Sequence, residues 1–408
     1  MLSGYYFYTA DGTKTEGSVN INNATDITIS GSHTYNSGYY PTQWTVSGLD
    51  TSDADATPDK IKWPYTAYVN GVKIQGTIDQ PGILSKYTGV IDPLYTATNF
   101  SWVNCGADNG VYLLFPTANG SENNATAYNV YLTRSVGQKL SSTNPIAATS
   151  ISVYIIVAGT GGNSTGGVNA FDRSMTRTVL SNLSAGNPYG QRELLVGESN
   201  GYYALFVIYG YSYSTTYSCF GDSFNTSLTK SQVSSATNLG VYGGTGSNIG
   251  DYILILNGYS IQTFDKTLTK TNTSTGESGS WNDAGASGNK KHCMFAGGGQ
   301  AAGVNIKTSA ISFNEELTRT KATDLNNKKI YVTASNTKNY ILFAGGFDQN
   351  NNTLDEVEVY DNNLTKSVVT PLHAGRRRMC HSTKISNYAI FAGGDNTVWS
   401  TIDAYYES

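Results

Sequence analysis

The sequence predicts an all-β protein whose main part is a seven-bladed β-propeller, and three observations lead to this fold. An apolar strand closed by one or two glycines recurs every ~40–50 residues, the repeat length of a propeller blade. A second motif, Phe/Tyr-Asn/Asp-x-x-Leu/Met-Thr-Lys/Arg, follows most of these strands. The chain also contains 44 Gly and 30 Tyr, with abundant Asn, Ser and Thr. These residues favour strands and turns over helices.

The apolar strand occurs seven times. Its copies begin at Tyr112, Tyr154, Tyr203, Tyr252, His292, Tyr340 and Tyr388, spaced 42, 49, 49, 40, 48 and 48 residues apart. The second motif occupies residues 171–177, 224–230, 264–270, 313–319 and 360–366, and a shortened form ends at Arg134. Seven apolar strands are therefore followed by only six of these elements.

The missing element lies ahead of the first blade. Leu84-Ser85-Lys86, followed by Asp92-Pro93-Leu94, resembles Leu364–Lys366 followed by Pro371-Leu372, with two more residues between the two parts. We expect residues 83–91 to form the outermost strand of the last blade, because a ring closed by both chain ends leaves no open blade to fray. This divides the chain into an N-terminal region, 1–82, and a propeller, 83–408.

The most regular blades resemble the kelch family. The residues that carry this resemblance are the double glycines of YILFAGG and YAIFAGG, the strand EVEVYD and the Pro-Leu-x-x-x-Arg step at 371–376. The resemblance implies four-stranded, kelch-like blades and gives Arg376 a structural role between blades. A WD40 propeller is the weaker alternative, since no Gly-His or Trp-Asp dipeptide recurs.

The N-terminal region contains two short hairpin motifs, ADGTKTEGSV at 10–19 and VNGVKIQGTI at 69–78. Each reads as a strand, a tight Asp-Gly or Asn-Gly turn and a returning strand. Together with DATPDKIKWPYTAY, the second copy resembles a module that recurs in tail-associated proteins of phages and prophages, and residues 27–40 resemble the spacer between such modules. The resemblance implies a small β-hairpin attachment region that contacts other virion proteins through residues 1–82.

The sequence offers little for catalysis. Its four Cys and four His show no zinc-ligand spacing, and no Walker or G-x-S-x-G motif occurs. We identify no carboxylate pair that a cleft would bring together for glycan hydrolysis. The sequence therefore predicts neither an enzyme nor a resident metal or cofactor. An irregular calcium site at Asp348 and Asp355 is an alternative that stays open.

Charge and hydropathy exclude two classes of partner. Charged residues make up 14% of the chain and the net charge is −4, without the clustered base of a nucleic-acid surface. No apolar stretch reaches the ~20 residues that a membrane span needs. We therefore expect neither nucleic acid nor membrane as a partner.

The predicted binding residues lie on loops. In a propeller the loops between the second and third strands of a blade (b–c loops) and those between blades (d–a loops) share one face. The b–c loop of blade three is rich in tyrosine. Trp281 lies in the long d–a linker after blade four, and Trp399 lies in the short b–c segment of blade seven. Tyr and Ser/Gly/Asn-rich loops are typical of adaptable binding surfaces, although β-propensity alone also favours Tyr. The candidate ligand-binding residues are Tyr211, Tyr213, Tyr217, Trp281 and Trp399.

Two functions remain in competition. The first is a phage tail-fibre or receptor-binding adhesin, whose propeller loops contact a polysaccharide, or a protein, on the host cell surface. The second is a decoration or head-fibre protein that packs on capsid or tail without binding a receptor. Either would be located in the virion, assembled in the host cytoplasm and released by lysis. Either would also be a homo-oligomer, with a trimer as one form.

Overall fold

The computed structural model divides the chain into two compact units, Met1–Pro81 and Gly82–Ser408. The residues that it describes are 6–16, 33–35, 44–46, 54–61, 65–77, 82–94, 105–116, 124–140, 145–159, 167–184, 192–210, 218–236, 244–300, 304–376, 379, 383–394 and 400–408. No helix in this part of the chain is long and apolar enough to cross a membrane.

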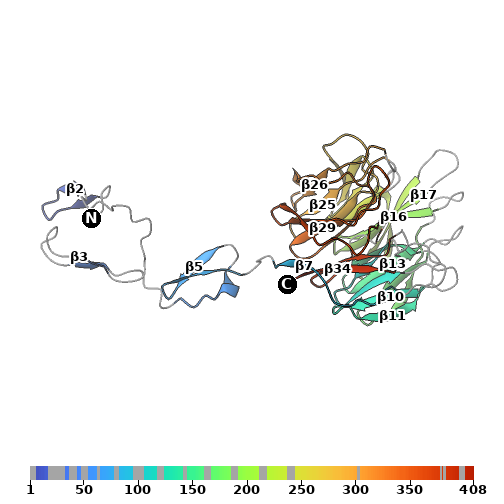
Figure 1. Ribbon diagram of the computed structural model, residues 1–408, viewed down its shortest axis with the longest axis horizontal. Coiled ribbons are helices and arrows are strands. Elements are labelled where there is room, and N and C mark those ends of the chain that lie inside the picture. The colour runs from blue at the N-terminus through green and yellow to red at the C-terminus, as the bar shows by residue number, and fades with distance from the viewer. Residues whose placement is uncertain are drawn as a thin grey trace. The chain divides into compact units, whose positions relative to one another are not determined.

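The second unit is a seven-bladed β-propeller, which confirms the predicted fold class (Figure 1). Each blade is a four-stranded antiparallel sheet with strands a to d from the axis outward. Blade one contains β8 (Ala107–Asp108), β9 (Tyr112–Pro116), β10 (Asn124–Asn129) and β11 (Arg134–Lys139). Blade two contains β12 (Pro145–Ile151), β13 (Tyr154–Gly159), β14 (Val168–Phe171) and β15 (Arg177–Leu180). Blade three contains β16 (Arg192–Ser199), β17 (Tyr203–Gly210), β18 (Ser218–Asn225) and β19 (Lys230–Val233).

The remaining blades repeat this plan. Blade four contains β20 (Thr245–Ile249), β21 (Tyr252–Leu256), β22 (Ser260–Phe264) and β23 (Lys270–Ser274). Blade five contains β24 (Gly285–Gly288), β25 (Cys293–Ala296), β26 (Ala310–Phe313) and β27 (Arg319–Lys321). Blade six contains β28 (Thr333–Asn336), β29 (Tyr340–Ala344), β30 (Val357–Asp361) and β31 (Lys366–Val369). Blade seven contains β32 (Lys384–Ile385), β33 (Tyr388–Ala392), β34 (Ile402–Glu407) and β7 (Leu84–Lys86).

The outermost strand of blade seven comes from the start of the unit. β7 pairs antiparallel with β34, with Lys86 opposite Tyr405 and Leu84 opposite Glu407, and the two strands lie side by side in Figure 1. This is the strand that the sequence places at 83–91. Both ends of the propeller chain therefore share one sheet, and the ring closes through backbone hydrogen bonds.

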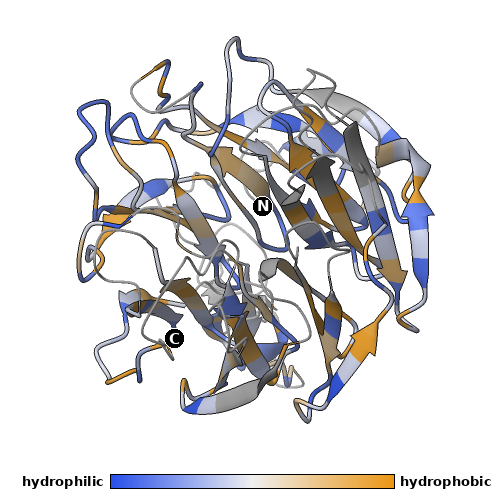
Figure 2. Cartoon of the chain, turned by 90° about the vertical axis from the view of Figure 1, so that its right-hand side faces the viewer, coloured by the Kyte–Doolittle hydropathy of each residue, from blue (hydrophilic) through white to orange (hydrophobic). Residues whose placement is uncertain are grey.

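The core lies between neighbouring blades. The cluster between blades five and six, for example, contains Met294 and Ala296 from one sheet and Ile341 and Phe343 from the next. The apolar b strands are buried on both faces, which explains their uninterrupted apolar sequence. Hydrophobic segments accordingly follow the inner and middle strands in Figure 2. An edge-to-face aromatic pair, such as Phe343–Tyr360 at 5.8 Å between ring centroids, recurs in several blades and contributes ~0.5–1.5 kcal/mol.

The second sequence motif forms the turn between strands c and d. In blade six the Asp361 carboxylate accepts hydrogen bonds from the N–H groups of Asn363 and Thr365, both at 2.8 Å. Leu364 takes a left-handed φ of 60°, and the equivalent residues Leu132, Met175, Leu228, Leu268 and Leu317 do the same. The motif therefore specifies a tight turn with one left-handed residue that is not glycine.

The lysine or arginine that ends this motif connects neighbouring blades. Lys366 Nζ donates to the Asp324 carbonyl at 2.6 Å, and Tyr360 Oη donates to the Thr323 carbonyl at 2.6 Å. Equivalent bonds join Arg134 to Pro93 (2.8 Å), Lys230 to Asn182 (2.7 Å) and Lys86 to Pro371 (2.6 Å). In each case the acceptor lies in the linker that enters the blade. The repeated motif thus locks each of these blades to the one before it.

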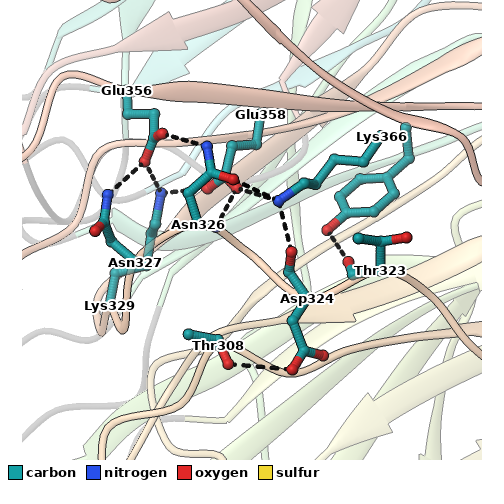
Figure 3. A network of polar contacts seen from close by, with 10 residues as sticks. Thr308, Thr323, Asp324, Asn326, Asn327, Lys329, Glu356, Glu358 and Lys366 are labelled. Atoms are coloured by element: carbon teal, nitrogen blue, oxygen red, sulfur yellow. Dashed lines mark hydrogen bonds and ion pairs between the residues drawn. The ribbon is translucent and has the colours of Figure 1, made fainter.

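The interblade hydrogen bonds of Lys366 and Tyr360 belong to a larger polar network (Figure 3). Lys329 is fully buried between Glu356, at 3.1 Å, and Glu358. Lys366 reaches the same Glu358 at 3.3 Å. Buried charges are tolerated only when each has a partner, so this group fixes the linker between blades five and six.

The first unit consists of small hairpins. β1 (Tyr6–Tyr8) pairs with β2 (Lys14–Glu16), and β5 (Thr66–Val69) pairs with β6 (Val72–Gln75) around an Asn70-Gly71 turn with two left-handed residues. Both predicted hairpins are therefore present. A third, formed by β3 (His33–Tyr35) and β4 (Trp44–Val46), begins inside the segment read as a spacer from the sequence. A short 3-10 helix spans Pro58–Lys60.

Candidate functional site

The predicted binding residues fall mostly outside the described part of the chain. Tyr211, Tyr213 and Tyr217, in the b–c loop between β17 and β18, lie outside the described residues, as does Trp399. Their proposed role stays a prediction. Trp281 is the only one of the five whose side chain can be placed.

The prediction that Trp281 contacts a ligand is wrong, because its side chain is fully buried. It packs in the cluster that contains Leu256 and Ile261, and its main-chain N–H donates to the Gly258 carbonyl at 2.5 Å. Gly258 belongs to the very short b–c turn of blade four. That turn leaves the end of the blade uncovered, and the indole covers it, so Trp281 anchors the linker that follows blade four.

The linker nevertheless forms one wall of a pocket on the predicted face. This pocket has a volume of about 810 Å³ and lies among the turn 276–279, the b–c loop residues 305–309, strand β27 and Lys328. Four cationic side chains and one carboxylate line it: Lys307, Arg319, Lys321, Lys328 and Glu277. We call it the cationic pocket.

Two glycines let the linker approach these cations. Gly276 and Gly279 have left-handed φ values of 68° and 83°. A Cβ at Gly276 would lie 2.7 Å from Arg319 Cζ, and one at Gly279 would lie 3.6 Å from Lys307 Nζ. Glycine at 276 therefore allows the guanidinium to lie against the backbone, where any side chain would displace it.

The cations of the pocket are only partly neutralised. Glu277 lies 3.4 Å from Lys321 and 3.9 Å from Arg319. Burial acts to raise the pKa of Glu277, but hydrogen bonding from Ser309 and the charge of Lys321 lower it overall. Burial lowers the pKa of Lys307, which Glu277 only partly offsets. Asp324 lies 3.7 Å from Lys321 on its other side, so two carboxylates accompany the four cations, and an added anion would be favourable here.

A second cavity, of about 510 Å³, lies among the a strands around the propeller axis. We call it the channel. Each blade contributes the residue four positions before the Tyr or His that opens its apolar repeat. This ring consists of Asp108, Ser150, Ser199, Asn248, Gly288, Asn336 and Lys384. The channel also reaches the a–b turn residues Gly110, Ser152 and Gly201. It therefore extends to the face opposite the b–c loops.

Glu198 adds a second carboxyl group to the channel. Burial raises its pKa to about 7, while a hydrogen bond with Asn248 and the charge of Lys384 act in the opposite direction. Burial also raises the pKa of Asp108, against the charge of Lys384 and a hydrogen bond from the Gly110 N–H. A Cβ at Gly246 would lie 3.0 Å from Glu198 Cγ, so glycine leaves room for this side chain along the wall.

Sequence reasoning did not identify these two acids as lining residues of one cavity. Asp108 and Glu198 lie on β8 and β16, 90 positions apart, and line one cavity. Counting back four or five residues from each apolar strand would have placed both on the channel wall. That signal is present in the sequence but becomes visible only when the blades are aligned on their b strands.

Two other predicted residues have structural roles. Arg376 is fully buried and donates to the carbonyls of Gly393 (3.1 Å) and Thr401 (2.9 Å) and to the Asp403 carboxylate, which confirms its predicted role. Asp348 accepts the N–H groups of Asn350 and Asn352 and so closes its own loop. Within the described residues no group of three or more His, Cys, Asp or Glu side chains is arranged to hold a metal ion.

Comparisons with known proteins add little to this picture. No protein-family model matches the sequence, and no curated protein matches it. Among solved structures, the chain is similar to one described as "Structure of YjhT", at 14% identity and a TM-score of 0.43. That match covers 68% of this chain and 99% of the other. The function of the two cavities is therefore argued from their own residues.

Proposed function

We propose that the protein is a receptor-binding adhesin of a phage particle. Its kelch-like propeller presents the face of b–c and d–a loops to the host cell, and residues 1–82 attach it to other virion proteins. The cationic pocket carries this proposal, because it lies on the face that the loops elaborate. Loops on a rigid scaffold are where binding residues concentrate.

The charge of the pocket indicates the kind of receptor. The whole chain has a net charge of −4, yet four cations and one carboxylate line this pocket, with Asp324 beside Lys321. Such a site favours an anionic group, and bacterial surface polysaccharides carry carboxylates or phosphates at regular intervals. We propose that the pocket binds one such group of a surface glycan, without turning it over. Assembly as a homo-oligomer in the virion would multiply this modest contact.

The test removes charge from the pocket without disturbing the core. Lys321 and Lys328 are exposed, so the double variant Lys321→Met, Lys328→Met should fold normally. The matched control is Lys266→Met, Lys290→Met, which removes the same charge from exposed turns on the opposite face. Both purified proteins are measured for binding to host cells at two salt concentrations.

We expect the pocket variant to bind about tenfold more weakly and with a smaller salt dependence, while the control binds like the unaltered protein. Two contacts to an anion at roughly 0.2–1 kcal/mol each account for a loss of this size. Equal binding by the two variants would contradict the receptor role. Particles that adsorb normally but assemble poorly would instead favour a decoration or head-fibre protein.

A further inference from the structure

The channel is built by all seven blades, which sets it apart from the receptor pocket. Its ring residues occupy one equivalent position on every a strand. Asn248 is exposed to the cavity, whereas its neighbours Ser247 and Ile249 are buried. The Asn248 side chain therefore faces the channel.

Glycines bring the inner strands close together around this ring. A Cβ at Gly288 would lie 2.4 Å from the Asn248 carbonyl oxygen, and one at Gly106 would lie 2.7 Å from Thr383 Cγ2. Glycine thus lets its strand lie against the backbone of the neighbouring a strand at 288 and against the Thr383 side chain at 106. The volume of the channel, about 510 Å³, falls in the ~300–1,000 Å³ range of small-molecule sites.

The lining combines donors and acceptors of both charges. Lys384 and Arg173 supply cations, Asp108 and Glu198 supply carboxyl groups, and amide and hydroxyl side chains lie between them. No aromatic side chain occurs among the described residues that line the cavity. An anion would be repelled by the acids and a cation by Lys384. A neutral molecule with many hydroxyl groups meets neither penalty, since each hydroxyl both donates and accepts.

We propose that the channel is a second binding site, which takes one neutral, hydroxyl-rich small molecule such as a monosaccharide or a sugar alcohol. The Glu198 carboxylate and the Asn248 amide lie together on the wall of blades three and four and bind adjacent hydroxyl groups. Lys384 and Asp108, from blades seven and one, bind the far side of the molecule. The site is reached from the face of a–b turns, away from the cationic pocket.

The charge state of Glu198 supplies a specific signature. Asn248 on β20, Lys384 on β32 and Cys293 on β25 are the groups that interact with it from the surrounding strands. With a pKa of about 7, Glu198 ionises near neutral pH. An ionised carboxylate accepts a stronger hydrogen bond from a hydroxyl than a protonated one does. Binding should therefore tighten as pH rises through this value.

The experiment measures binding of glucose, galactose, mannose and mannitol, one at a time, to the full chain by calorimetry. At least one of them should bind with a stoichiometry of one per chain. Its affinity should rise about fivefold between about pH 6 and about pH 8, as Glu198 changes from mostly protonated to mostly ionised. Asn248→Ala should weaken binding about tenfold, the effect of one or two lost hydrogen bonds.

Two variants keep the result interpretable. Glu198→Gln preserves shape and should make the affinity independent of pH, with an unchanged melting temperature. The cationic-pocket variant Lys321→Met, Lys328→Met should bind the sugar like the unaltered protein, which separates this site from the receptor function. The proposal is overturned if none of the four probes binds, or if binding is unaffected by Asn248→Ala. It is also overturned if inorganic phosphate or ethylammonium occupies the channel instead.

Discussion

Substitution of Lys86 by methionine tests whether β7 closes the propeller as an ordinary outer strand does. Lys86 lies outside the main repeat in sequence but occupies the position of Lys366 in blade six. Its Nζ contacts the Asp403 carboxylate at 2.8 Å and the Pro371 carbonyl at 2.6 Å. Methionine keeps the aliphatic stem and removes both bonds, so the change isolates the polar lock.

The expected cost follows from these contacts. Asp403 is only 3% exposed and would retain Arg376 and the His373 N–H as partners. A hydrogen bond to a charged group contributes ~1.5–3 kcal/mol. The Lys86 side chain is 20% exposed, so water partly replaces one of the two lost bonds. The loss of both bonds should therefore cost about 3 kcal/mol. For a large domain this lowers the melting temperature by about 6 °C, at roughly 2 °C per kcal/mol.

The assay compares three variants of the full chain by calorimetry or by circular dichroism. Lys366→Met removes the equivalent bonds between blades five and six and should cost at least as much, because Lys366 also contacts the buried Glu358 at 3.3 Å. Lys73→Met lies in the hairpin unit and should leave the propeller transition unchanged. If Lys86→Met melts like the unaltered protein while Lys366→Met is destabilised, β7 does not close the ring under these conditions.

Three further outcomes are expected. Deletion of residues 1–91 should prevent a stable propeller while deletion of 1–78 should not, and equal melting of the two truncations would refute closure by the N-terminal strand. Trp281→Ala should destabilise the chain by ~3–5 kcal/mol, as for other buried aromatic residues, because the indole is fully buried; a change confined to host binding would contradict this. Burial lowers the pKa of His292, against a hydrogen bond to the Asn362 carbonyl, so the unfolded chain binds this proton more readily. Stability should therefore rise with pH up to about 6.5, the ordinary value, and His292→Gln should flatten that part of the profile in urea titrations.

The sequence predicts the fold well because the blade repeat is itself a physical requirement. A b strand buried on both faces must be apolar, and its end must turn sharply, so Tyr340–Ala344 followed by two left-handed glycines marks a blade wherever it occurs. The count of seven strands against six turn motifs also located the closing strand. The sequence does not show that the motif's lysine joins neighbouring blades, because the carbonyl that accepts from Lys366 lies 42 positions away in the chain.

The candidate site was harder to predict for two reasons. The ring of the channel contains five different residue types, from Asp108 to Lys384, and so produces no motif. Its members share only a position relative to the b strand. Trp281, in contrast, was conspicuous in sequence, but a large aromatic in a loop can cover a core or meet a ligand. Its burial depends on the length of the b–c turn of another segment, at Gly258.

The two faces of the propeller are held together by different kinds of hydrogen bond. On the face of a–b and c–d turns, Asn109 donates to the Asp172 carbonyl at 3.0 Å, and Asn200 donates to the Asp265 carbonyl at 3.0 Å. These bonds join each turn to the next blade and surround the channel. A rigid mouth suits a small molecule, because little ordering entropy is lost on binding. On the opposite face, the described b–c segments are joined to the linkers between blades by backbone bonds, such as Trp281 N–H to the Gly258 carbonyl at 2.5 Å and Gly346 N–H to the Arg376 carbonyl at 2.8 Å.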